Sequence, residues 1–174
     1  MGQDPNDSED LLQRAAAGDQ DALPALWERH RARLRRMVRL RLDRRLQSRV
    51  DPSDVLQEAY LDLAARLADY ARDRPMPPFL WLRLVTGQRL PQVHRHHLGA
   101  ALRDAGREVS LYRGALPQAS SASLAAQLLG RLTTASQAAL RAERQLQLQA
   151  ILNAMDPIDR EILALRHFEG LSNG

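Results

Sequence analysis

The sequence predicts an all-α protein, and two observations on its 174 residues support this prediction. Leu and Ala together number 57, whereas Val, Ile and Thr, which favour strands, together number 12. Apolar residues also recur every three or four positions over long stretches, which is the period of an amphipathic helix. Cysteine is absent, and this excludes disulfide bridges and cysteine-bound zinc sites.

Charge alternates in blocks along the chain, although the net charge is only +4. All 25 basic residues are arginines, and the net charges of the blocks are −5 for 1–21, +8 for 22–50, −4 for 51–73, +5 for 74–113 and zero for 114–174. A mixed solvated surface does not usually alternate in this way. We therefore expect one side of the protein to face a polyanion and another side to face a different partner.

The first basic block is predicted to form a long helix with one buried stripe. The apolar residues of this stripe are Leu23, Leu26, Trp27, Leu34, Met37, Val38 and Leu42. Most of the arginines lie off the stripe, among them Arg29, Arg33, Arg36 and Arg44. Two interpretations stay open for them, namely a solvated helix face and a binding surface.

The next helix is predicted to begin at Asp51-Pro52. Aspartate is a preferred N-cap residue, proline fits the first turn, and Asp54 meets the positive end of the helix dipole. Asp54, Glu58 and Asp62 then recur every four residues, although like charges at this spacing slightly destabilise a helix. We expect an acidic face that serves a partner, with simple solubility as the alternative.

A break is predicted from Tyr70 to Pro78, where three prolines and Met76 follow Arg74. A new helix is expected from about Phe79 to about Gly106, with Pro91 kinking or splitting it. Its basic residues include the run His94-Arg95-His96-His97. We do not expect a metal site there, because the nearest acids lie more than a turn away.

The segment 106–136 is rich in Ser, Gly, Thr and Ala and is predicted to be a linker, with a short helical piece at 124–129. Helix resumes near Ser136, and the cap signal recurs at Asp156-Pro157. Gly170 is predicted to end that last helix, followed by apolar Leu171. Ser172 has the character of another N-cap, so we expect that the given sequence is truncated before a further helix.

Catalytic and membrane functions are not expected from this sequence. It contains no glycine-rich phosphate loop and no nucleophile elbow, and its carboxylates lie along exposed helix faces. No apolar stretch approaches the roughly 20 residues that span a bilayer, and the acidic N-terminus is unlike a signal peptide. We expect a cytoplasmic protein without cofactor or metal.

Three segments resemble bacterial sigma factors of the sigma-70 class. Residues 51–63 resemble the polymerase-binding helix, with Asp54, Gln57 and Glu58 as the specific pattern. The stretch Phe79-Leu-Trp81-Leu resembles the start of the helix that reads the −10 element. Residues 152–172 resemble the opening of the region-four domain. Their order and spacing are most similar to the extracytoplasmic-function (ECF) type, in its planctomycete-like subgroup.

The resemblance implies a region-two domain at 1–105, a flexible linker at 106–136 and a partial region-four domain at 137–174, whose helix-turn-helix lacks its recognition helix. The implied partners are core RNA polymerase and promoter DNA, and an anti-sigma protein stays an open question. The residues implied for polymerase binding are Asp54, Gln57, Glu58, Leu61 and Asp62. Those implied for DNA binding are Arg74, Phe79, Trp81, Arg83, Arg89, His94, Arg95 and His97.

The function implied is promoter recognition and strand opening during transcription initiation. Two departures from the family pattern are Ala64, where many relatives have tryptophan, and Pro91. Trp81 has a second interpretation, because an aromatic residue at helical spacing is more often part of a core. Two other functions stay open, namely a helix-turn-helix regulator that binds DNA without polymerase, and a helical protein-interaction module.

Overall fold

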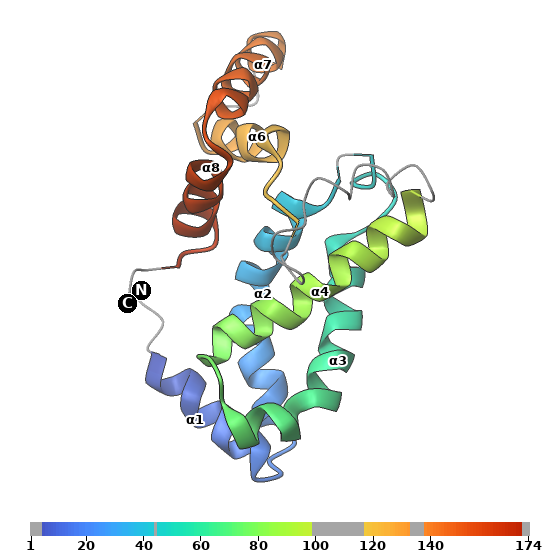
Figure 1. Cartoon of the computed structure of the whole chain (residues 1–174), viewed down its shortest axis with the longest axis vertical. Helices are drawn as coiled ribbons and strands as arrows, with labels where there is room; N and C mark the ends of the chain where they lie inside the picture. The colour runs from blue at the N-terminus through green and yellow to red at the C-terminus, as the bar shows by residue number, and fades with distance from the viewer. Residues whose placement is uncertain (1–4, 44, 99–116, 133–137, 172–174) are drawn as a thin grey trace.

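The computed structural model describes residues 5–43, 45–98, 117–132 and 138–171, and within these ranges every regular element is helical (Figure 1). The all-α prediction is therefore confirmed for the described part of the chain. None of the helices in these ranges is both long and apolar enough to cross a membrane.

The first four helices pack around one apolar core (Figure 1). They are α1 (Pro5–Ala16), α2 (Ala22–Arg41), α3 (Pro52–Asp73) and α4 (Pro78–Leu98). The apolar stripe predicted on α2 supplies much of this core, and each fully buried leucine contributes about 1.5–3 kcal/mol to stability. The core leucines that have no exposed surface are Leu12, Leu26, Leu34, Leu42, Leu63, Leu82 and Leu90.

Helix α3 begins where the sequence predicts. The Asp51 carboxylate accepts a hydrogen bond from the Ser53 backbone N–H at 2.7 Å, and Pro52 is the first helical residue. The predicted break at Tyr70 is wrong by one turn, because the helix continues to Asp73 and ends with Arg74 at φ 39°. The cause is a long-range contact, since the buried Tyr70 ring stacks on Trp81 and holds the last turn in place.

Helix α4 is a single helix that continues through Pro91, so the predicted split does not occur. Leu90 and Val93, on either side of the proline, both pack against the core of the first four helices. These contacts hold the two halves on one helix although Pro91 cannot donate a backbone hydrogen bond. The predicted helix end near Gly106 lies outside the described residues.

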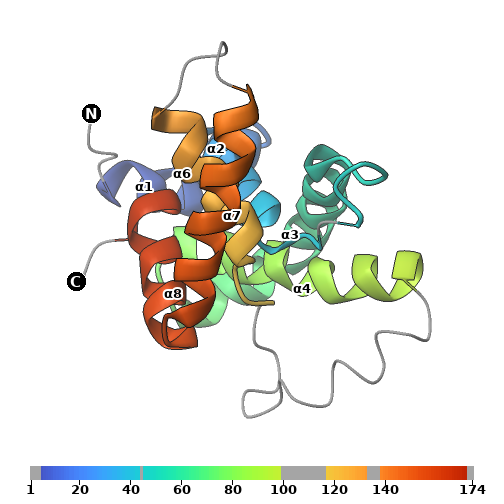
Figure 2. The same cartoon turned by 90° about the horizontal axis from the view of Figure 1, so that it is seen from above.

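The C-terminal helices α6 (Ser121–Leu132), α7 (Ala138–Ala154) and α8 (Pro157–Leu163) form a second group with the π-helical turn η2 (Ala164–Phe168). Figure 2 shows this group on the side of α2 that faces away from α3. Its core includes Leu40 of α2. Helix α6 lies inside the segment predicted to be a linker, and it is longer than the helical piece expected at 124–129.

The last helix follows the predicted local signals. The Asp156 carboxylate accepts from the Ile158 N–H at 2.8 Å, as Asp51 does at the start of α3. The helix ends at Gly170, whose φ of 66° suits glycine, and the Leu171 N–H donates to the Leu165 carbonyl at 3.0 Å. The π-helical turn was not predicted. In it the Glu169 N–H bonds to the Ala164 carbonyl five residues back.

Candidate functional site

The residues predicted to bind polymerase lie along α3, and most of them are available to a partner. Asp54, Gln57 and Glu58 are exposed, and Leu61 keeps 68% of its surface accessible. Asp51 caps this helix and Pro52 is its first residue, so together they fix where the helix begins and which residues share a face. We call this group, Asp54, Gln57, Glu58 and Leu61, the acidic face.

An apolar groove lies beside the acidic face, between α2 and α3, with a volume of about 540 Å³. Trp27 of α2 and Tyr60 of α3 form part of its wall, with their rings edge to face at a centroid distance of 5.5 Å. Gln57 and Leu61 line the groove as well as belonging to the acidic face. Sequence reasoning missed the groove, because Trp27 was interpreted as an ordinary member of a buried stripe.

Asp62 differs from the acidic face because its side chain is mostly buried and accepts two hydrogen bonds from Arg89. Its two carboxylate oxygens accept from Arg89 Nε and Nη2 at 2.5 and 2.6 Å, and Glu58 lies 3.5 Å from Arg89 Nη1. The hydrogen bond to Asp62 is the main cause that raises the pKa of Arg89 above its usual value. A residue predicted to bind polymerase is thus paired with one predicted to bind DNA, and neither is free in this conformation.

Arg83, also predicted to bind DNA, points into the C-terminal segment instead. Its Nε lies 2.5 Å from Glu169 Oε2, and only 15% of its side chain is exposed. The same Glu169 pairs with Arg41 of α2, and Arg41 also pairs with Glu161 of α8. Arg83 therefore joins α4 to the C-terminal helices in the described conformation, and does not lie on an open basic face.

The two predicted aromatic residues of α4 occupy different environments. Trp81 is 5% exposed and stacks on Tyr70 with a centroid distance of 4.0 Å and an interplanar angle of 4°. It is a core residue here, in agreement with the second interpretation, and base stacking would require the ring to leave the core. Phe79 is half-buried between His30 and Arg33, whose guanidinium carbon lies 3.6 Å from the ring centroid.

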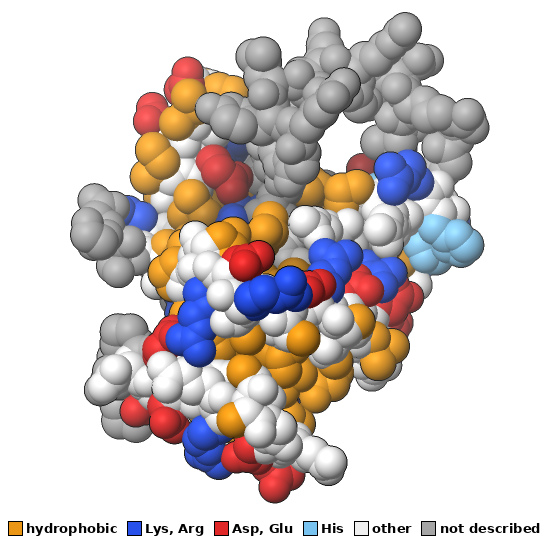
Figure 3. Space-filling model, turned by 60° about the horizontal axis from the view of Figure 1, so that its bottom comes forward, with side chains coloured by type: hydrophobic (Ala, Val, Ile, Leu, Met, Phe, Trp, Pro, Cys, Tyr) orange, Lys and Arg blue, Asp and Glu red, His pale blue; other side chains and the backbone are white. Residues whose placement is uncertain are grey.

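The remaining predicted DNA-binding residues lie at the two ends of α4. Arg74 is paired with Glu9 of α1 at 2.5 Å. The half-buried His94 accepts the Asp43 backbone N–H at Nε2 (3.2 Å), and burial is the main cause that lowers its pKa. Only Arg95 and His97 are exposed without such a contact to a distant helix. Figure 3 shows arginine and acidic side chains side by side on one face of the molecule, with histidines at its edge.

Sequence reasoning also missed a group of four arginines, three on one face of α2 and one in the turn that follows it. Arg31, Arg35 and Arg39 recur every four residues on one face of α2, and Arg49 lies near them. The four-residue spacing was the signal that could have revealed them. Among the described residues, no group of three or more His, Asp or Glu side chains could hold a metal ion.

Comparisons with family models, curated proteins and solved structures gave no match to this chain.

Proposed function

We propose that the chain is a sigma factor that binds core RNA polymerase and takes part in promoter recognition and DNA opening. The observation that supports this proposal best is the acidic face beside the apolar groove of α2 and α3. Asp54, Gln57 and Glu58 combine the motif spacing with exposure, and Leu61 adds an apolar contact next to the groove. An apolar centre with a charged rim is the usual composition of a protein-binding surface.

The DNA side of the proposal depends on the exposed C-terminal end of α4. Arg95 and His97 are available there, and arginine binds phosphate with a planar fork of donors. Arg83 and Arg89 can contribute only if their ion pairs with Glu169 and Asp62 open. We expect the ion pairs of Arg89 to open when polymerase binds, because polymerase would compete with Arg89 for Glu58 of the acidic face, next to Asp62.

The test is capture of purified core RNA polymerase by the tagged full chain. The variant Asp54→Arg with Glu58→Arg should abolish capture, because it places two positive charges on the acidic face. The matched control is Asp10→Arg with Glu143→Arg, which reverses two exposed acids on α1 and α7 and should leave capture unchanged. Helical circular dichroism verifies that both variants fold.

The outcomes separate the proposal from its alternatives. If the variant Asp54→Arg with Glu58→Arg captures polymerase as well as the wild type does, the acidic face is not the binding surface. A chain that captures no polymerase but binds duplex DNA would instead be a polymerase-independent regulator. Transcription from a promoter library by polymerase with the added chain tests the promoter-directed part of the proposal.

A further inference from the structure

One face of α2 presents a regular row of arginines, of which only Arg31 also borders the groove of the proposed polymerase site. Arg31, Arg35 and Arg39 are separated by four residues each, and all three are exposed. Four residues of α-helix advance by about 6 Å, so the row presents a guanidinium every 6 Å or so along a rigid axis. Arg49, in the turn that follows α2, lies near one end of the row.

These arginines are less engaged than the other arginines of α2. Arg33 and Arg36 donate to the backbone carbonyls of Glu169 and Phe168, at 2.9 and 3.0 Å. By contrast, within the part of the chain that the structure describes, Arg39 and Arg49 make no ion pair or side-chain hydrogen bond. The nearest acid to Arg35 is Asp51 at 3.9 Å, and Asp51 already caps α3. Arg31 has one exposed neighbour, Glu28, at 3.4 Å.

Three adjoining hollows follow this row, and Arg39 lines all of them. The first lies over the row itself, between Arg31 and Arg39, with a volume of about 470 Å³. The second, of about 420 Å³, extends toward Arg49 and Ser48. The third, of about 410 Å³, lies between α2 and α6. All three hollows border on Arg39, and we call them together the arginine groove.

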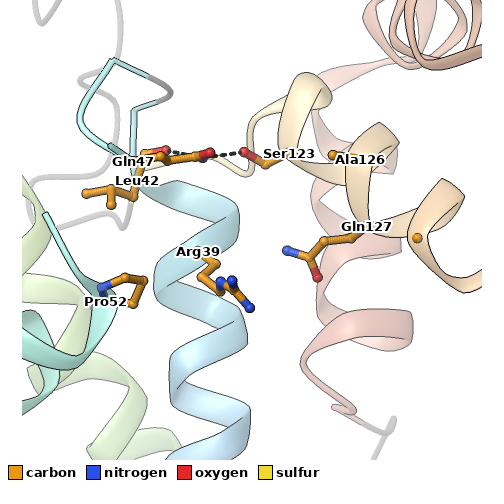
Figure 4. A pocket seen from close by; sticks show the side chains of 8 residues that line it. Arg39, Leu42, Gln47, Pro52, Ser123, Ala126 and Gln127 are labelled. Carbon is orange, nitrogen blue, oxygen red and sulfur yellow. Dashed lines mark hydrogen bonds between the residues drawn. The ribbon is translucent and has the colours of Figure 1, made fainter. Parts of the chain in front are cut away.

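Helix α6 forms the far wall of the arginine groove with short and uncharged side chains. Figure 4 shows Arg39 of α2 and Gln127 of α6 directed toward one another across the third hollow. Gln47 bridges the top of this hollow by donating to the Ser123 hydroxyl at 3.0 Å. Ala126 and Gly130 add almost no side chain, and this leaves room for a bulky ligand.

We propose that the arginine groove binds the sugar-phosphate backbone of duplex nucleic acid, at a surface separate from α4. Each strand of a duplex carries evenly spaced phosphates, one per about 3.4 Å of axis, along a backbone that winds around this axis. A row of guanidiniums about 6 Å apart can therefore meet several phosphates of one strand in turn. Arginine binds phosphate through two parallel N–H donors. The amides and hydroxyls of Gln47, Ser48, Ser123 and Gln127 are further donors of the kind that contact phosphate and sugar.

Two features favour a duplex backbone over other anionic partners. Among the described residues, no aromatic side chain lines the three hollows, whereas sites for single strands usually stack bases on aromatic rings. The fixed helical repeat also matches a polymer with evenly spaced charges better than an acidic peptide, whose carboxylates are irregular. Glu28 lines one end of the groove, and Asp51 and Asp54 line the other, where Asp51 lies 3.9 Å from Arg35. These acids limit the positive stretch to the arginines between them.

The experiment measures binding of a fluorescent 20-base-pair duplex of arbitrary sequence to the full chain, by anisotropy, over a series of salt concentrations. Each phosphate contact contributes about 0.9 to the slope of log affinity against log salt. The variant Arg35→Gln with Arg39→Gln should flatten this slope by about 1.8, and with affinities that converge near 1 M salt it should weaken binding about 60-fold near 0.1 M salt. These side chains are exposed, so the variant should fold as the wild type does.

The matched control is Arg14→Gln with Arg72→Gln, which removes two exposed arginines from α1 and α3 and should leave the slope unchanged. Three outcomes would each overturn the proposal. The two variants could flatten the slope equally, the variant Arg35→Gln with Arg39→Gln could leave the slope unchanged, or the wild type could fail to bind the duplex. Displacement of the duplex by polyglutamate at equal charge concentration would also overturn it, in favour of an acidic protein partner. None of these readouts involves polymerase, so failure here is separate from failure of the sigma-factor proposal.

Discussion

The guanidinium of Arg41 is paired with the carboxylate of Glu169 although neither side chain has any exposed surface. This contact joins α2 to the last turn of the described chain. Arg83 of α4 binds the other oxygen of the same carboxylate at 2.5 Å, so one acidic residue neutralises two arginines from different helices. The turn is held further by the backbone carbonyls of Glu169 and Gly170, which accept from Arg33.

Replacing Glu169 by glutamine should destabilise the protein strongly. The change removes one of the two carboxylates that bind the buried guanidinium of Arg41 and leaves Glu161 as its remaining partner. Breaking a buried pair of this kind costs about 3–5 kcal/mol. Urea unfolding followed by circular dichroism measures the loss. The control is Asp69→Asn, which breaks an exposed pair with Arg72 and should cost less than about 1 kcal/mol. A similar small loss in Glu169→Gln would mean that the buried pair contributes little.

The stacked pair Tyr70 and Trp81 gives a second prediction. Trp81→Ala should cost about 3–5 kcal/mol of stability, as expected for a large core residue, whereas a ring kept only for DNA contact should cost no more than about 0.5 kcal/mol. Tyr70→Phe should cost about 1 kcal/mol, because it removes only the hydroxyl bond to the Met76 carbonyl. Thermal and urea unfolding of the two variants discriminate between a core role and a surface role for Trp81.

Comparison of sequence and structure separates local signals from long-range ones. The caps at Asp51 and Asp156 were predictable, because an N-cap depends on neighbouring residues only. The partner of Arg83 was not, because Glu169 lies 86 positions away in the sequence. The spacing of apolar residues predicts that an arginine lies off the buried stripe of its helix. It does not predict whether that arginine contacts solvent, DNA or a distant carboxylate. The exposure of Asp54, Gln57 and Glu58 agrees with their positions off the buried side of α3, whereas their role in binding a partner stays a prediction.

His30 gives a prediction about pH. Its ring is buried, and burial, assisted by Arg33 and Arg29, lowers its pKa to about 4 from the ordinary 6.5. Between these two values the unfolded chain binds more protons than the folded one, so stability falls as the pH is lowered from about 6.5 to about 4. The full shift corresponds to about 3 kcal/mol. Proton NMR should show the His30 ring titrating near pH 4 in the native protein.

The variant His30→Gln verifies the origin of this effect. Glutamine does not titrate, and its amide can still bond to the Ser8 hydroxyl that lies 3.0 Å from His30 Nε2. We expect the variant to lose less stability than the wild type between pH 6.5 and pH 4, when both are unfolded in urea. Parallel losses in the two proteins would assign the acid sensitivity to other groups, of which His94 is the first to examine because its pKa is also lowered by burial.

The pair Arg89 and Asp62 tests whether the arginines of α4 are structural or available to DNA. The pair is about three-quarters buried and bidentate, so its coupling energy should fall between that of surface and buried pairs, at about 1–2 kcal/mol. A double-mutant cycle with Arg89→Gln and Asp62→Asn measures it by urea unfolding. A coupling near zero would show that the contact is weak enough for Arg89 to leave Asp62 for a phosphate at almost no cost. A coupling of the expected size requires any DNA complex that uses Arg89 to supply that energy first, so Arg89→Gln should weaken DNA binding far less than the same change at Arg95.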